Sequence, residues 1–204
     1  FPSAVVIGLT ATPCRTDGKG LGTFFNAIVE CPGISELTRM GFLVPAITYS
    51  QKPPNLRNIH KVAGDYNNDE LAAVMNQRKL VGDVVEEWRR RAYAQPTIVF
   101  AVNIEHSLAI TKQFNDAGIP SEHVDGTTPN EIRDGVFSRS LVVSNVGVYT
   151  EGTDVPHVSC IIIARPTMSV GLYIQMAGRG LRPSPGKTNC IILDHGGCAL
   201  MHGL

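Results

Sequence analysis

The sequence predicts an α/β domain built around a mainly parallel sheet. From residue 97 onward, short apolar runs rich in Val and Ile alternate with segments of helical periodicity. Polar, glycine-containing segments follow several of these runs. Strands that alternate with helices form right-handed βαβ units, which bring ligands to the carboxyl ends of the strands. We therefore expect the functional residues in the loops that follow the strands.

The apolar and helical patterns also place the individual elements. The run at residues 4–9 predicts a short buried strand that Pro13 ends, because proline donates no ladder hydrogen bond. Trp88 falls on the apolar stripe of a long helix, which favours the core over a base-stacking role. Residues 51–64 are polar and contain adjacent prolines, as is typical of a surface loop. The expected strands are residues 4–9, 43–50, 97–102, 121–124, 141–146, 158–164 and 189–193. The expected helices are residues 35–40, 69–92, 105–117, 130–137 and the segment after Ser169.

Composition sets broad limits on the function. The chain has 204 residues, of which 43% are hydrophobic, so a sizeable core can form. Lys plus Arg and Asp plus Glu each number 18, so no global basic field points to nucleic acid, although a groove can be basic on a neutral protein. The five cysteines contain no C-x-x-C pair, and no apolar run is long enough to cross a membrane. We expect a cytoplasmic protein with reduced thiols and no membrane partner.

A Q-x-x-G-R-x-x-R pattern near the end of the chain carries the strongest chemical signal. Its members Gln175, Gly178, Arg179 and Arg182 share one face if the segment is helical, and Ser169 is a suitable N-cap. Two guanidinium groups one turn apart suit a polyphosphate, because each is planar, always charged and able to bind two oxygens. The alternative is that both arginines only complement the dipole at the end of the helix.

A polar segment after the fifth expected strand is the second candidate. Gly147 and Gly152 would allow close backbone approach, Thr150 and Thr153 offer hydroxyls, and Asp154 offers a carboxylate for ribose hydroxyls. The alternative is an ordinary loop rich in turn-forming residues. The arginine pattern about twenty residues further on favours a functional loop.

Five short motifs follow one another along almost the whole chain. They are Thr10-Ala11-Thr12, residues 97–107, residues 124–133, Glu151-Gly152-Thr153-Asp154 and the segment from Gln175 to Arg182. In this order they resemble the third motif, the fourth motif, the segment after it, the fifth motif and the sixth motif of superfamily 2 helicases and translocases. Within that superfamily, the residues of the last two motifs are similar to those of bacterial RadD-type DNA-repair helicases and their prophage relatives.

This resemblance implies a fold, a domain organisation and residue roles. The fold would be a RecA-like three-layer domain at residues 34–204, and residues 1–33 would be the end of a first RecA-like, ATP-binding domain. Across the cleft between the two domains, the resemblance implies the following sites. Arginine fingers for the γ-phosphate of ATP would be Arg179 and Arg182, supported by Gln175. Nucleotide contacts would come from Gly152, Asp154 and Gly178. Contacts to a DNA backbone would come from Thr150, Asn103 and Thr127. Coupling of hydrolysis to domain closure would use Thr10 and Thr12.

Two motifs of the family are missing from this sequence. The only Gly-Lys-Thr, at Gly186-Lys187-Thr188, lacks the first glycine of a G-x-x-x-x-G-K-[ST] phosphate loop, because Leu181 stands there. The acidic motif that would hold Mg²⁺ is also missing, so most ligands for ATP and Mg²⁺ should lie outside this chain, and the chain alone should not hydrolyse ATP. Two cysteines and two histidines lie close together near the end of the chain, at Cys190, His195, Cys198 and His202. Their spacing matches no set of four ligands of a structural zinc site, so we expect no metal site there.

Other functions remain open from the sequence. The motor could move along duplex DNA without unwinding it, as a subunit of a restriction or remodelling complex. A RecA-like domain could also serve only as an interaction module, although the intact arginine pair argues against that. An unrelated nucleotide-binding enzyme would need a complete ligand site within the chain, and the sequence shows none.

Overall fold

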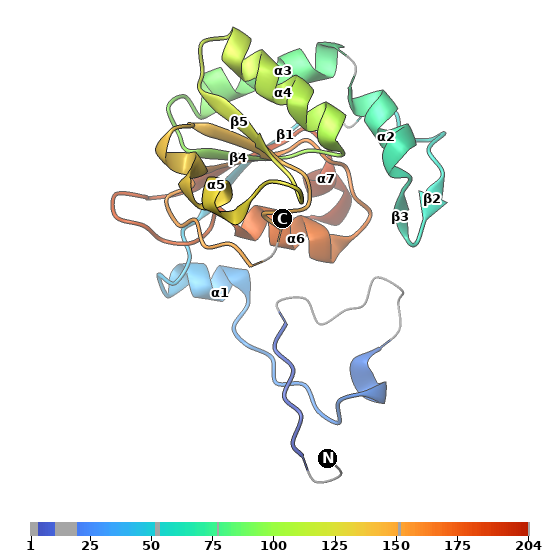
Figure 1. The fold of residues 1–204 in the computed structure, drawn as a ribbon. Coiled ribbons are helices and arrows are strands. Elements are labelled where there is room, and N and C mark those ends of the chain that lie inside the picture. The colour runs from blue at the N-terminus through green and yellow to red at the C-terminus, as the bar shows by residue number, and fades with distance from the viewer. Residues whose placement is uncertain (1–3, 11–19, 52–53, 77, 151, 204) are drawn as a thin grey trace.

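The computed structural model describes residues 4–10, 20–51, 54–76, 78–150 and 152–203. Within them, six parallel strands form one sheet in the order β1-β8-β7-β4-β6-β5 (Figure 1). Its strands are β1 (Ala46–Ser50), β4 (Thr97–Phe100), β5 (Ser121–Val124), β6 (Val142–Asn145), β7 (Cys160–Ile163) and β8 (Cys190–Asp194). A separate antiparallel ribbon consists of β2 (Lys61–Val62) and β3 (Asp65–Tyr66). The helices are α1 (Ile34–Arg39), α2 (Asn68–Met75), α3 (Arg78–Arg91), α4 (Ile104–Asp116), α5 (Asn130–Gly135), α6 (Val170–Gly178) and α7 (Cys198–His202), with 3-10 turns η1 (Leu21–Thr23) and η2 (Val136–Ser138).

Helices cover both faces of the sheet. Figure 1 shows α3 and α4 on one side of it and α5, α6 and α7 on the other. Alternate residues of the central strands pack into the two cores, so that Ile162 contacts the layer of α3 and α4 while Ile161 and Ile163 contact the layer of α6. A parallel sheet needs this double cover, which is why its central strands are apolar throughout. The predicted three-layer α/β fold is confirmed.

Trp88 anchors the layer formed by α3 and α4. It is fully buried, packs edge-to-face on Phe114 of α4, and donates its indole N–H to Thr97 Oγ1 over 2.7 Å. This satisfies the one polar group of the ring, as a buried tryptophan requires. The predicted core role of Trp88 is confirmed.

The predicted strand at residues 4–9 is wrong. The structure assigns no strand there, and the side chains of Val5, Val6, Ile7 and Leu9 are 71–95% exposed. An isolated extended segment gains no ladder hydrogen bonds and buries little surface, so it needs neighbouring strands, and the described residues offer it none. Thr10, which follows, is exposed, and Thr12 lies outside the described residues.

The long helix predicted at residues 69–92 is two helices, α2 and α3. Asn67 caps α2 by accepting hydrogen bonds from the amides of Asp69 and Glu70. The apolar side chains of α2 pack with Ile59 and Val102 in a small cluster of their own, apart from the core of Trp88. The break therefore lets each half bury its apolar side in a different core. No helix among the described residues is long and apolar enough to cross a membrane.

Candidate functional site

Helix α6 carries the first half of the arginine pattern. Ser169 caps it as predicted, because its Oγ accepts a hydrogen bond from Leu172 N over 3.2 Å. The helix ends at Gly178, and the chain continues in tight turns, with Leu181 N donating to Gly178 O over 3.1 Å. Arg182 therefore lies beyond the helix, so the four residues of the pattern do not share one helical face as predicted.

Gly180 lies in the turn that follows the helix. A Cβ at this position would lie 2.2 Å from Cys190 Sγ and 2.7 Å from Ile161 Cγ1. Only glycine lets the turn after α6 rest directly on β7 and β8. Gly180 thereby fixes the points at which Arg179 and Arg182 leave the backbone. Sequence reasoning missed it, although a glycine between the two arginines was a visible signal.

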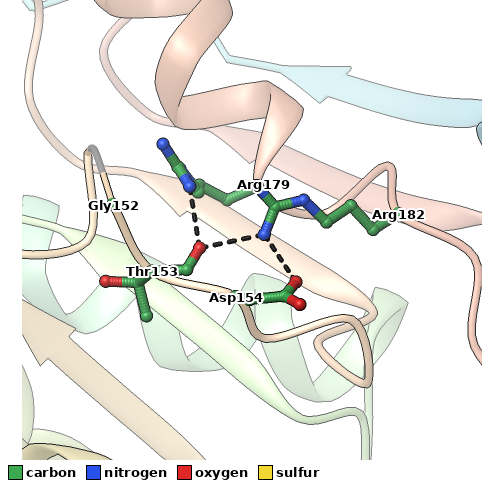
Figure 2. Close-up of a pocket in the computed structure, with 5 residues that line it drawn as sticks. All are labelled: Gly152, Thr153, Asp154, Arg179 and Arg182. Atoms are coloured by element: carbon green, nitrogen blue, oxygen red, sulfur yellow. Dashed lines mark hydrogen bonds and ion pairs between the residues drawn. The ribbon is translucent and has the colours of Figure 1, made fainter.

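Both arginines turn toward the loop that follows β6 (Figure 2). Arg179 donates to the carbonyl of Thr150 through Nη2 over 2.7 Å and through Nε over 3.1 Å, and Nη1 donates to the carbonyl of Thr153 over 2.8 Å. Arg182 donates through Nη1 to the same Thr153 carbonyl over 2.9 Å and to Asp154 Oδ1 over 2.7 Å. One backbone oxygen thus joins the two guanidinium groups.

An open pocket of about 510 Å³ lies at this junction, lined by Gly152, Thr153, Asp154, Arg179 and Arg182. Among the described residues of the lining, two guanidinium groups face one carboxylate, so this part of the lining is net positive. Arg182 uses only Nη1 for its contacts within the described part of the chain, which leaves Nε and Nη2 able to donate. Its side chain is 38% exposed, and that of Asp154 is 79% exposed, so both are accessible to a ligand that enters from solvent.

Gly152 shapes the loop that follows β6. Its φ is +74°, a left-handed conformation that side chains rarely adopt, and Gly147 has a φ of +69°. A Cβ at either position would meet no heavy atom within 4 Å. The loop therefore needs these glycines for its backbone shape. The close approach of a ligand to Gly147 and Gly152 stays a prediction.

The three residues predicted to contact nucleic acid each follow a strand. Asn103 follows β4, Thr127 follows β5 and Thr150 follows β6, and these strands are neighbours in the sheet. Each side chain already holds its own turn. Asn103 Oδ1 accepts from His106 N over 2.9 Å, and Thr150 Oγ1 donates to Gly147 O over 3.1 Å. The carboxyl edge of the sheet thus carries all three, as the parallel topology predicted.

Asp125 organises the turn of Thr127, and sequence reasoning missed it. Its Oδ1 accepts from Thr127 Oγ1 over 2.7 Å and from Thr127 N over 2.8 Å. These hydrogen bonds hold the pKa of the Asp125 carboxyl well below its usual range, with a further contribution from His123. The acidic residue directly after β5 was the available signal.

Of the remaining candidate residues, Gln175 and Gly178 belong to α6, whereas Asp194 stabilises the fold. Gln175 lies on α6, partly exposed, and Gly178 ends that helix. Asp194 at the end of β8 is fully buried and accepts hydrogen bonds from Ser50 Oγ and from the amides of Cys198 and Ala199. Among the described residues, no group of three His, Cys, Asp or Glu side chains could hold a metal ion.

Comparison with known families agrees with this geometry. Residues 76–184, more than half of the chain, match the family model described as the helicase conserved C-terminal domain. The chain belongs to this family. As a helicase C-terminal domain it falls within superfamily 2, so the resemblance seen in the motifs is confirmed. The match spans most of the described sheet and the whole of the arginine pattern.

Individual relatives support the assignment. The chain is 33% identical over 194 residues to a 51.5 kDa protein of a Lactococcus phage, covering 93% of this chain and 42% of the relative. It is 32% identical over 198 residues to the Saccharomyces cerevisiae protein named "Putative ATP-dependent helicase IRC3", covering 93% of this chain and 29% of that protein. The helicase C-terminal domain described here thus spans less than half the length of either relative.

Solved structures confirm the fold. A fragment assigned to the HsdR subunit of a type I restriction enzyme from Vibrio vulnificus superposes with a TM-score of 0.77 at 20% identity, over 96% of this chain and 40% of that one. The ATP-dependent Type ISP restriction-modification enzyme LlaBIII, solved bound to DNA, gives a TM-score of 0.54 at 20% identity, over 80% of this chain and 13% of that enzyme.

Proposed function

We propose that this chain supplies the second motor domain of an ATP-dependent DNA helicase or translocase. Residues 34–204 form that domain, and residues 1–33 belong to the end of the first RecA-like domain. The observation that supports this proposal most directly is the convergence of Arg179 and Arg182 on the Thr153 carbonyl, beside the exposed carboxylate of Asp154. A phosphate chain placed there would meet fixed positive charge.

The two arginines have unequal roles in this proposal. Arg182 is the finger for the γ-phosphate, because its Nε and Nη2 groups can donate to phosphate oxygens while Asp154 holds Nη1. Arg179 braces the loop through three hydrogen bonds and adds positive charge to the site. Asp154 meets the ribose, Gln175 supports the arginines, and Gly152 and Gly178 border the nucleotide. The remaining ligands for ATP and Mg²⁺ come from the first RecA-like domain.

Nucleic acid would lie across the carboxyl edge of β4, β6 and β5. Asn103, Thr127 and Thr150 place an amide and two hydroxyls there, groups that suit the sugar–phosphate backbone of a strand. The two hydroxyls would donate to that backbone in exchange for their present acceptors, Asp125 Oδ1 and Gly147 O. Such contacts carry little base information, so the motor would act on DNA with low sequence specificity. A role in cytoplasmic DNA repair or recombination is part of the proposal. It rests on the resemblance to RadD-type helicases.

DNA-stimulated ATP hydrolysis by the full-length protein that contains this chain tests the proposal. Arg182→Ala should lower kcat by about 10³-fold, because an arginine finger stabilises charge in the transition state. Arg182→Lys should recover only part of that loss, since lysine cannot bind two oxygens in a fork. Arg39→Ala removes an exposed arginine of α1 and serves as the matched control. Unchanged hydrolysis in a folded Arg182→Ala protein would refute the assignment.

A second assay separates unwinding from translocation alone. Strand separation from a forked duplex reports unwinding, while displacement of the third strand of a triplex reports movement along duplex DNA. A helicase gives both signals, and a translocase of the kind found in restriction complexes gives only the second. Neither signal, together with no DNA-stimulated hydrolysis, would support a non-catalytic interaction module instead.

A further inference from the structure

A second pocket adjoins the arginine pocket. It has a volume of about 480 Å³ and lies between α5 with η2 on one side and the loop after β6 on the other. Gly152, Thr153 and Asp154 line both pockets, so a single ligand can occupy the two across this shared wall. The volume is within the range of ordinary small-molecule sites.

Three aromatic rings line the second pocket. The Phe137 ring lies 5.0 Å from the His157 ring, edge-to-face, and 6.0 Å from the Tyr149 ring, measured between ring centres. Tyr149 is buried and donates its hydroxyl to Arg133 O over 3.3 Å, so it fixes the wall. Phe137 is half-buried and His157 is exposed, so both rings can meet a ligand. Burial and the nearby Lys187 lower the pKa of His157, which favours the uncharged form of this ring.

The polar part of the second pocket carries charges of both signs, because Arg133, Asp134 and Asp154 all line it. Asn130 and Asp134 lie four residues apart on α5, so they are neighbours on one side of the helix, and both are exposed. An amide both donates and accepts hydrogen bonds, and a carboxylate accepts them from exocyclic amino groups. The charge of Arg133 is offset by the carboxylates of Asp134 and Asp154, so this pocket is less positive than the arginine pocket. Its aromatic rings and polar rim suit an aromatic group with hydrogen-bonding edges, whereas the arginine pocket suits an anion.

We infer that the second pocket receives the base of the nucleotide whose phosphates Arg182 binds, with the base stacked against Phe137 and its edge read by Asn130 and Asp134. The ribose then crosses the shared wall at Asp154. The inference rests on the proposed function, because it assumes that a nucleotide occupies the arginine pocket. It adds a base-binding surface on this domain, which none of the comparisons assigns.

Binding of two probes by the full-length protein separates the two ideas. ATP carries a base and phosphates, whereas inorganic tripolyphosphate carries phosphates alone. Phe137→Leu removes the ring but keeps apolar packing, and it should weaken ATP binding by about five- to tenfold while leaving tripolyphosphate binding unchanged. Asn130→Ala, on the exposed rim, should alter the ratio of ATP to GTP affinity without changing tripolyphosphate binding. Tyr93→Leu replaces an exposed ring beyond the end of α3 and is the matched control.

The outcomes are distinguishable. Suppose that Arg182→Ala weakens the binding of both probes while Phe137→Leu and Asn130→Ala weaken the binding of neither. The base pocket is then refuted and the proposed function stands. If Arg182→Ala weakens neither probe, the proposed function fails. If Phe137→Leu weakens ATP and tripolyphosphate equally, its effect is on the fold, and the base pocket is again refuted. Selective weakening of ATP by Phe137→Leu supports the inference.

Discussion

Two glycines, Gly178 and Gly180, should respond in opposite ways to the same substitution. Gly180→Ala places a methyl group 2.2 Å from Cys190 Sγ and 2.7 Å from Ile161 Cγ1, so the turn or the sheet must move. Overpacking of this kind costs about 1–3 kcal/mol of the free energy of unfolding. Gly178→Ala meets no heavy atom within 4 Å and lies at the end of α6, where alanine stabilises a helix by about 0.5–1 kcal/mol over glycine. The two variants should thus differ by about 1.5–4 kcal/mol.

Thermal unfolding of the purified protein measures this difference. For a domain of this size about 1 kcal/mol shifts Tm by about 2–4 °C, so the two variants should be separated by about 3–16 °C. Adding Cys190→Ala to Gly180→Ala removes the nearer clashing atom and should make the pair less destabilised than the sum of the single changes. A Gly180→Ala protein as stable as the wild type, or a Gly178→Ala protein equally destabilised, would refute the packing argument. Loss of ATP hydrolysis by a stable Gly178→Ala protein would instead support the proposed approach of the nucleotide to Gly178.

Three further predictions concern the core and the thiols. Burial lowers the pKa of His106 to about 4, and an unfolded histidine titrates near 6.5, so stability should fall by about 3 kcal/mol as the pH drops from 6.5 to 4. Urea titrations across that range check this, and His106→Gln should flatten the slope. Thr97→Val leaves the indole N–H of Trp88 without its acceptor and should lower the free energy of unfolding by about 1–3 kcal/mol. The emission of this sole tryptophan should report the change, and an unaltered midpoint would count against the hydrogen bond. Exposed Cys31 should react quickly with a thiol reagent, whereas the buried cysteines of β7 and β8, whose thiol pKa values burial raises, should react only after denaturation. Equal rates for all of them would contradict the core described here.

Local signals in the sequence were enough to predict most of the RecA-like sheet and its helices. The apolar runs gave the strands because both faces of a parallel sheet are buried, and Ile161, Ile162 and Ile163 show this directly. The cap at Ser169 and the core position of Trp88 also followed from residue type and spacing. The resemblance to superfamily 2 helicases implied that Arg179, Arg182 and Asp154 contact the same nucleotide, and the structure brings these three side chains together.

The predictions that were wrong concern features that depend on contacts between residues distant in sequence. Spacing alone could not show that Gly180 rests on Cys190 and Ile161, so the helix was extended too far, to Arg182. Apolar content at residues 4–9 suggested a strand, but a strand exists only where neighbours accept its hydrogen bonds. The packing of Phe137 against Tyr149 and His157 was missed because these partners lie beyond the next strand.

The pairing of β1 with β8 affects how the chain folds during translation. Ser50 of β1 lies opposite Asp194 of β8, 144 residues later in the chain. At about 5–20 residues per second, a ribosome needs about 7–30 s to make that interval. Throughout this time β1 has no strand to join and presents open hydrogen-bonding groups beside Ile47, the kind of edge that recruits other chains. The yield of folded protein should therefore depend on what shields β1 while translation continues.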